Sequence, residues 1–204
     1  TQGVSSAASD VYKRQAYRGR SEDGYITTIK VSTAGKITHV VPKQEHDKKD
    51  GWYNSLIKVD DNTVALFYRG DESGSSSIIK TFDIPADGST ITQVATKKLN
   101  IAGNYHKIIA MGGDKYVTTM ATGNIYNSIQ YITTFSISDN GLTITQIDQE
   151  TESGAGPYGD IVKMDGDTYA VASYGTSKNN KSEQSGSGSF IACLLYTSPS
   201  PRDS

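Results

Sequence analysis

A repeat of about 53 residues runs through this chain of 204 residues. Phe82 and Phe135 lie 53 residues apart, as do Ile29 and Phe82. A tyrosine recurs at almost the same spacing, as Tyr53, Tyr105 and Tyr158. A period of this length is typical of stacked supersecondary units, each too small to bury its own apolar surface. We therefore expect the stability of the chain to come from contacts between neighbouring units.

Each unit contains four short segments with apolar residues at alternate positions, which is the period of a β-strand. Tight turns that contain Gly, Asn or Asp, such as 139–141, join the first segment to the second and the third to the fourth. No stretch has the apolar spacing of a helix. The pattern predicts an all-β fold, a β-propeller with four-stranded antiparallel blades and an incomplete ring. The first segments cover 25–31, 78–84 and 131–137, the second 37–40, 91–94 and 144–147, the third 56–59, 108–111 and 161–164, and the fourth 64–68, 116–120 and 169–173.

Other repeat architectures fit less well. Ankyrin, TPR and HEAT units need helices, and leucine-rich repeats need a shorter period with a Leu and Asn ladder. A β-sandwich has similar strand spacing but gives no reason for a repeat of this length.

Both ends of the chain resemble translated sequencing adapter. Residues 5–15 (SSAASDVYKRQ) and 193–203 (CLLYTSPSPRD) back-translate to two partner adapter strands. We therefore expect 1–15 and 193–204 to be adapter-derived and non-native, and we expect the parent chain to carry remaining blades. The predicted units are 16–76 for blade 1, 77–128 for blade 2, 129–188 for blade 3 and 189–192 for the start of blade 4.

Composition excludes several classes of function. The net charge of −2, or −3 without the two ends, is unlike the basic footprint of a nucleic-acid-binding protein. No apolar run approaches membrane-spanning length. The only cysteine, Cys193, lies in the adapter-like end, so neither a disulfide framework nor a thiolate metal site is expected. No cofactor is expected.

The candidate binding residues lie in the loops that follow the second and fourth segments. These loops vary between repeats, and binding residues favour loops on a rigid scaffold. Aromatic rings beside amides and carboxylates suit a sugar or a protein ligand. The three recurring tyrosines also have a structural interpretation, because they keep the repeat period. The candidates are Trp52, Tyr53, Arg69, Asp71, Asn104, Tyr105, His106, Asn124, Tyr126 and Tyr158, with Glu72 beside them.

The histidines and acidic turns give no metal or catalytic motif. His39 is expected on a strand wall and His46 in a solvated charged loop. No pair of histidines has metal-ligand spacing, and no G-x-S-x-G nucleophile motif is present. The acidic turns 60–62 and 165–167 are too short for a calcium site. Residues 139–143 resemble the Asp-box of sialidase propellers, but Ile144 stands where that motif has Trp.

The repeat resembles those of uncharacterised secreted or surface-displayed β-propeller proteins. The similarity rests on YITTFSIS with GLTITQI (131–147), KTFDI with GSTITQV (80–94) and YNSLIKVDDNTVALFYRG (53–70). It implies an extracellular or cell-surface location and a non-enzymatic recognition or adhesion propeller that binds glycan or protein through the variable loops. Two alternatives stay open. One is a purely structural surface repeat, and the other is a glycan-active enzyme with carboxylates near the ring axis, drawn from Glu45, Asp47, Asp71, Glu72, Glu150 and Glu152.

Overall fold

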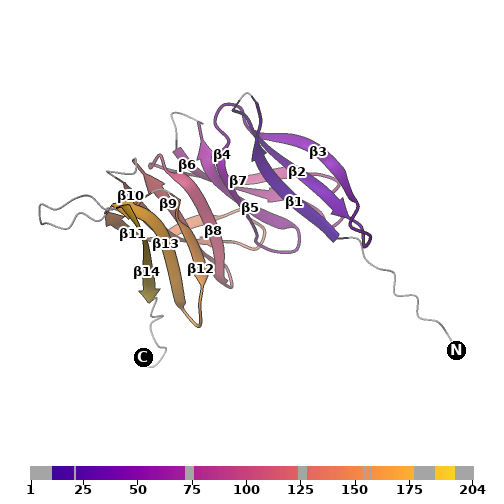
Figure 1. The fold of residues 1–204 in the computed structure, drawn as a ribbon. Coiled ribbons are helices and arrows are strands. Elements are labelled where there is room, and N and C mark those ends of the chain that lie inside the picture. The colour runs from indigo at the N-terminus through magenta and orange to yellow at the C-terminus, as the bar shows by residue number, and fades with distance from the viewer. Residues whose placement is uncertain are drawn as a thin grey trace, which may run out of the picture.

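The protein consists of strands throughout the part of the chain that its computed structural model describes. The described residues are 11–20, 22–71, 76–123, 128–153, 155–156, 158–176 and 187–195. They form four antiparallel sheets, which follow one another in chain order across the molecule (Figure 1). The all-β prediction is confirmed. Among the described residues, no helix is long and apolar enough to cross a membrane.

Two four-stranded sheets occupy the middle of the chain, and we number all the sheets I to IV in chain order. The strand order of sheet II is β4 (Trp52–Lys58), β5 (Thr63–Gly70), β6 (Ser76–Asp83) and β7 (Thr92–Leu99). The strand order of sheet III is β8 (Asn104–Gly112), β9 (Lys115–Thr122), β10 (Ile129–Ile137) and β11 (Ile144–Ser153). The prediction of four-stranded antiparallel sheets is therefore confirmed for both.

Three-stranded sheets flank this pair. Sheet I contains β1 (Val11–Arg18), β2 (Gly24–Val31) and β3 (Ile37–Asp47), and sheet IV contains β12 (Asp160–Lys163), β13 (Thr168–Thr176) and β14 (Ser187–Leu195). Residues 11–15 and 193–195, which the sequence predicts to be adapter-derived, pair with β2 and β13.

The sheets do not group the strands as the predicted blade boundaries do. The boundaries at 76/77 and 128/129 fall where β5 pairs with β6 and β9 pairs with β10. Each complete sheet therefore combines the last two strands of one sequence repeat with the first two of the next. The physical reason is the polar pattern of β7 and β11, whose many exposed residues fit the edge of a sheet and not its interior. The chain leaves the sheet after these outer strands.

Neighbouring sheets pack face to face through three apolar clusters. Ile26 of sheet I joins Leu66 and Phe82 of sheet II. Phe67 and Ile79, on the opposite face of sheet II, pack against residues of sheet III that include Phe135. Ile161 and Val171 of sheet IV pack against Val117 of sheet III. Both faces of sheets II and III are thus covered, and the repeating phenylalanines lie in these junctions.

The same kind of hydrogen bond joins sheet I to sheet II and sheet II to sheet III. The Thr28 hydroxyl donates to the Gly88 carbonyl oxygen at 2.7 Å, and the Thr81 hydroxyl donates to that of Gly141 at 2.7 Å. The two glycines occupy the turns before β7 and β11 with φ values of 66° and 70°, which glycine adopts without strain. The turn of one sheet therefore locks onto the face of the preceding sheet.

The first strands of successive sheets lie side by side. Strand β4 contacts β8, and β8 contacts β12. The amide of Ile108 donates to the Ser55 hydroxyl oxygen at 3.2 Å across the first of these contacts. This arrangement brings the beginnings of β4, β8 and the segment before β12 to one place.

Candidate functional site

Three tyrosines meet where the first strands of sheets II, III and IV begin. The ring centroids of Tyr53 and Tyr105 are 4.5 Å apart, and those of Tyr105 and Tyr158 are 4.3 Å apart. We name this set the tyrosine row. The sequence repeat thus produces a continuous aromatic surface.

The tyrosine row depends on an unusual backbone conformation. Tyr53, Tyr105 and Tyr158 have φ values of 54°, 57° and 71°, in the left-handed region that is unfavourable for an aromatic residue. In β4 and β8 the register with the next strand shifts at the tyrosine, which indicates a β-bulge. Backbone strain of this kind costs about 1–3 kcal/mol per residue and is concentrated at functional sites.

Tyr105 lies at the middle of the row and is half-buried. Burial, together with the hydroxyl groups of Tyr158 and Tyr53, raises the pKa of Tyr105 above its usual value. The phenol therefore stays neutral at physiological pH and can both donate and accept hydrogen bonds.

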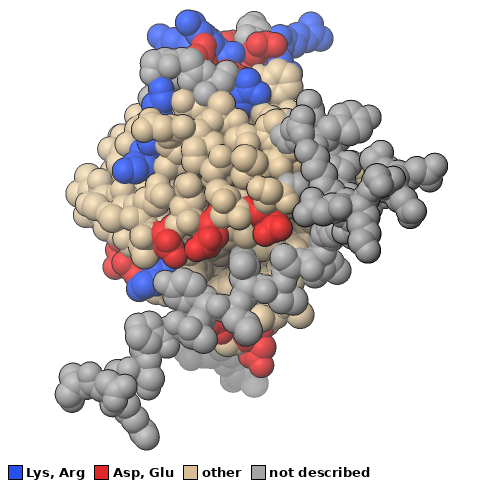
Figure 2. All heavy atoms as spheres, turned by 90° about the vertical axis from the view of Figure 1, so that its left-hand side faces the viewer, with Lys and Arg blue, Asp and Glu red and all other residues tan. Residues whose placement is uncertain are grey.

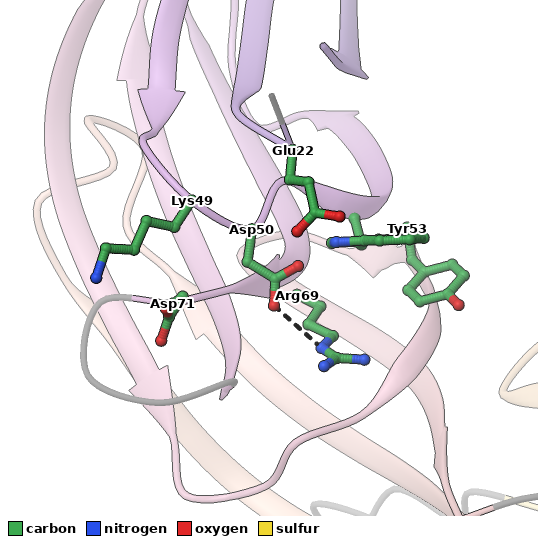
Figure 3. Close-up of a pocket in the computed structure, with 7 residues that line it drawn as sticks. Glu22, Lys49, Asp50, Tyr53, Arg69 and Asp71 are labelled. Atoms are coloured by element: carbon green, nitrogen blue, oxygen red, sulfur yellow. Dashed lines mark ion pairs between the residues drawn. The ribbon is translucent and has the colours of Figure 1, made fainter. Parts of the chain in front are cut away.

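A pocket of about 360 Å³ lies beside Tyr53. Its volume is at the lower end of the range for small-molecule sites. In Figure 3, Lys49 and Asp71 lie to one side of Asp50, and Tyr53 lies to the other. We name this cavity the Trp52 pocket. Its lining residues are Glu22, Lys49, Asp50, Trp52, Tyr53, Arg69 and Asp71.

Two glycines bring the loops of the pocket together. The amide of Gly51 donates to the Glu22 carbonyl oxygen at 2.8 Å. A Cβ atom on Gly51 would lie 2.1 Å from Cα of Gly24, so only glycine permits this approach. The Asp47 carboxylate then fixes the turn, because its Oδ1 accepts the amide of Asp50 at 3.1 Å and its Oδ2 accepts the Tyr68 hydroxyl at 3.1 Å. Glu22 and Asp50 are positioned by these contacts.

Arg69 connects the pocket to the tyrosine row. Its Nε lies 3.3 Å from Oδ2 of Asp50, and its Nη1 donates to Oδ1 of Asn104 at 2.8 Å. Asp50 is buried, and Arg69 lies opposite Trp52 in the β4–β5 register. A guanidinium shared between a buried carboxylate and an amide holds both side chains in fixed positions.

Arg18 covers part of the Trp52 indole. Its guanidinium carbon lies 3.4 Å from the ring centroid, which is a cation–π contact. The same guanidinium pairs with the Glu22 carboxylate at 2.6 Å on the surface. An exposed pair of this kind contributes at most about 1 kcal/mol, so a ligand can displace it.

A second hollow of about 320 Å³ adjoins the first and shares Lys49 and Asp71 with it. His46 lines this hollow and is buried against the Tyr68 ring, with 4.7 Å between the centroids. The expectation of a solvated His46 is therefore wrong, because the glycine at position 24 leaves room for the imidazole. Burial lowers the pKa of His46 to about 4.

The structure brings together most of the described candidates from the sequence. Trp52, Tyr53, Arg69 and Asp71 line one pocket, and Asn104 joins them through Arg69. Tyr105 and Tyr158 extend the aromatic surface. Asn124 and Tyr126 lie outside the described residues, as does Glu72.

His106 belongs to the packing below the row and not to its surface. It is 3 % exposed, its Nε2 lies 2.8 Å from the Ser77 hydroxyl, and its ring meets Phe67 edge-on. The predicted ligand contact is therefore wrong for this residue. The Ser77 hydroxyl is also fully buried, so the pair cannot meet a substrate. Burial lowers the pKa of His106 to about 3.

The candidate carboxylates from the sequence do not gather in one place. Asp71 lines the Trp52 pocket, and Glu45 and Asp47 line the second hollow. Glu150 and Glu152 lie on the outer strand β11. Sequence reasoning missed Glu22, Lys49 and Asp50, because it could not tell which loops meet. The glycines at 24 and 51 were the available signal of a close approach. Among the described residues, no three His, Cys, Asp or Glu side chains form a group that could hold a metal ion.

Comparison with known proteins gives similarity to solved structures but to no family model or curated protein. Among solved structures, the chain is similar to an α-L-arabinofuranosidase (CtGH43) from Clostridium thermocellum, with a TM-score of 0.40 and 12% identity over 91% of this chain and 68% of that chain. That protein is an enzyme. The finding is contrary to the expectation of a non-enzymatic recognition or adhesion propeller, and we correct that expectation accordingly.

Proposed function

We propose that this chain is part of a β-propeller enzyme that acts on glycans, with the Trp52 pocket as its catalytic site. The observation that carries the proposal is the meeting of three carboxylates, Glu22, Asp50 and Asp71, in a pocket bordered by aromatic rings. Glycoside hydrolysis uses two carboxyl groups beside the scissile bond. Aromatic rings offer an apolar surface on which a sugar ring can stack.

The three carboxylates differ in how firmly they are held. Asp50 is buried and paired with Arg69, so we assign it the role of nucleophile or general base, which requires a fixed carboxylate. The Glu22 side chain is 57% exposed and pairs with Arg18 on the surface. We assign it the general acid, a role that it can take once a bound sugar displaces Arg18. Asp71 then contacts sugar hydroxyls together with Lys49.

The tyrosine row extends this site along the sheets. Tyr105 and Tyr158 continue the aromatic surface away from the pocket, so we assign them further sugar units of the same glycan. The adjacent first strands support a propeller, in which these strands surround the axis. The remaining blades and the extracellular location stay predictions of the sequence.

Binding can be measured without a label, because Trp52 is the only tryptophan. Titration with oligosaccharides of pentoses and hexoses should change the tryptophan fluorescence, since a bound sugar displaces Arg18 from the indole. Aryl glycosides of the same sugars should be hydrolysed. Absence of both responses across the panel would contradict the proposal.

Catalysis is separated from binding by a pair of matched variants. Asp50→Asn should lower kcat by about 10²-fold or more while the fluorescence response to the glycan remains. Asp61→Asn is the control, because the Asp61 side chain is exposed in a turn outside the pocket and pairs with Lys58 at 2.7 Å. Equal activity of the two variants would refute the assigned role of Asp50.

A further inference from the structure

The outer face of sheet IV carries side chains whose repeat equivalents are covered elsewhere. Ile57, Ile109 and Val162 occupy the same position on β4, β8 and β12. Ile57 packs against the cluster between sheets II and III, and Ile109 packs against the cluster between sheets III and IV. Val162 is 55% exposed. The difference follows from position in the stack, because no described sheet lies beyond sheet IV.

A second row on the same face repeats the pattern. Val59 and Met111 pack against the same two clusters, whereas their equivalent Met164 is 62% exposed. On β13, Ala170 pairs with Val162 and Ala172 pairs with Asp160, so both alanines share this face. Figure 2, which views the side of the molecule where Figure 1 draws β12–β14, shows a largely uncharged area bordered below by a row of acidic side chains. We name Val162, Met164, Ala170 and Ala172 the trailing face.

The chain also carries the opposite half of a sheet junction. In sheet II, Tyr68, Ile78 and Phe82 form the face that packs on sheet I. Their equivalents in sheet I are Tyr17, Tyr25 and Ile29, by repeat spacing and strand register. Tyr17 and Tyr25 are in ring contact at 5.8 Å, and all three are half-buried. We name Tyr17, Tyr25 and Ile29 the leading face.

We propose that the trailing face of one molecule docks on the leading face of a second copy of this chain. A second copy is the partner that fits, because the same two kinds of face already pack on each other within the molecule. In each junction, the equivalent of the trailing face on one sheet packs on the equivalent of the leading face on the next sheet. The contact is head-to-tail, so it joins two different surfaces and can extend to further copies. Neighbouring exposed apolar side chains such as Val162 and Met164 favour association with another apolar face over contact with water.

Sedimentation velocity of the chain over a range of concentrations tests the proposal. The wild-type protein should associate as concentration rises. Val162→Asp should abolish association through the trailing face, and Ile29→Asp should abolish it through the leading face. Tyr17→Asp serves as a second leading-face variant if Ile29→Asp does not fold. Leu142→Asp is the control, because Leu142 is 64% exposed in a turn outside both faces.

Mixing Val162→Asp with Ile29→Asp gives the decisive result. Each variant alone should sediment as a monomer, whereas their equimolar mixture should form a dimer and nothing larger, since one intact junction remains. A monomeric wild type would overturn the proposal and leave the trailing face to a sheet of another protein or of a longer chain. Association of both variants at the wild-type level would overturn it equally. Enzyme activity does not enter either result, so the test is independent of the proposed function.

Discussion

Sheets II and IV contain equivalent residues but differ in what covers them. Sheet II is packed on both faces, and Ala65, Leu66, Phe67 and Tyr68 of its strand β5 are each 0% exposed. In sheet IV, one face packs on sheet III while Val162 and Met164 on the other are exposed. The same sequence pattern therefore gives a core position or a surface position according to the neighbour. Exposure in a repeat protein is a property of the junction more than of the residue.

The largest expected difference concerns the equivalent aliphatic residues of the first strands. Ile57→Ala and Ile109→Ala should each lower the free energy of unfolding by about 2 kcal/mol, because each leaves a gap in a junction. Val162→Ala should change it by less than about 0.5 kcal/mol in dilute solution, where the residue faces water. Urea denaturation of the three variants measures this. Equal losses at all three positions would show that sheet IV is covered.

Acidification should lower the free energy of unfolding through the junctions between sheets I and II and between sheets II and III. His46 and His106 lie between sheets I and II and between sheets II and III, and burial lowers their pKa values to about 4 and about 3. As pH falls below about 6.5, the unfolded chain binds protons that the folded chain does not. Each histidine should therefore lower the free energy of unfolding by about 1.4 kcal/mol between pH 7.5 and pH 5.5.

A matched pair of variants isolates this effect. His106→Gln should remove about half of the pH-dependent loss, because one of the two buried imidazoles is gone. His39→Gln should leave it unchanged, since His39 is exposed on β3. An unchanged pH dependence in His106→Gln would contradict the burial of that ring.

The smallest expected difference concerns two equivalent threonines. The Thr81 hydroxyl donates to Gly141 and accepts the amide of Ala95 at 3.0 Å. The buried hydroxyl of Thr134 has no partner among the described residues. Thr81→Val should lower the free energy of unfolding by about 1 kcal/mol, and Thr134→Val should leave it unchanged or raise it slightly. Thermal unfolding of both variants checks the prediction, which fails if the order is reversed.

The sequence predicted the strands well but not their grouping. Alternation of apolar residues and the turn glycines located the segments around Phe82 and Phe135, because these signals are local. Long-range pairing decides which connection links two strands of one sheet and which leads to the next sheet. Because the connections after β5 and β9 are short in sequence, the strands could be grouped into sheets in two ways. The polar sequence of β7 indicated an edge strand and was the usable signal.

The candidate site shows the same limit. Trp52 and Arg69 were recognisable because they do not recur in the other repeats, and the structure pairs them across two strands. The tyrosine row was foreseeable as a repeat but not as a stack, since ring contact depends on the bulges. Glu22 and Asp50 could not be joined from sequence, because their loops meet only through the Gly24–Gly51 approach.

Native-state hydrogen exchange tests the stacking of the sheets most directly. The account predicts that the amides of strands β4–β7 exchange as one slow unit and those of β8–β11 as a second, with β12–β14 exchanging faster than both at concentrations where the chain is monomeric. Slow exchange units that follow 77–128 instead, or protection in β12–β14 equal to that of sheet II, would contradict it.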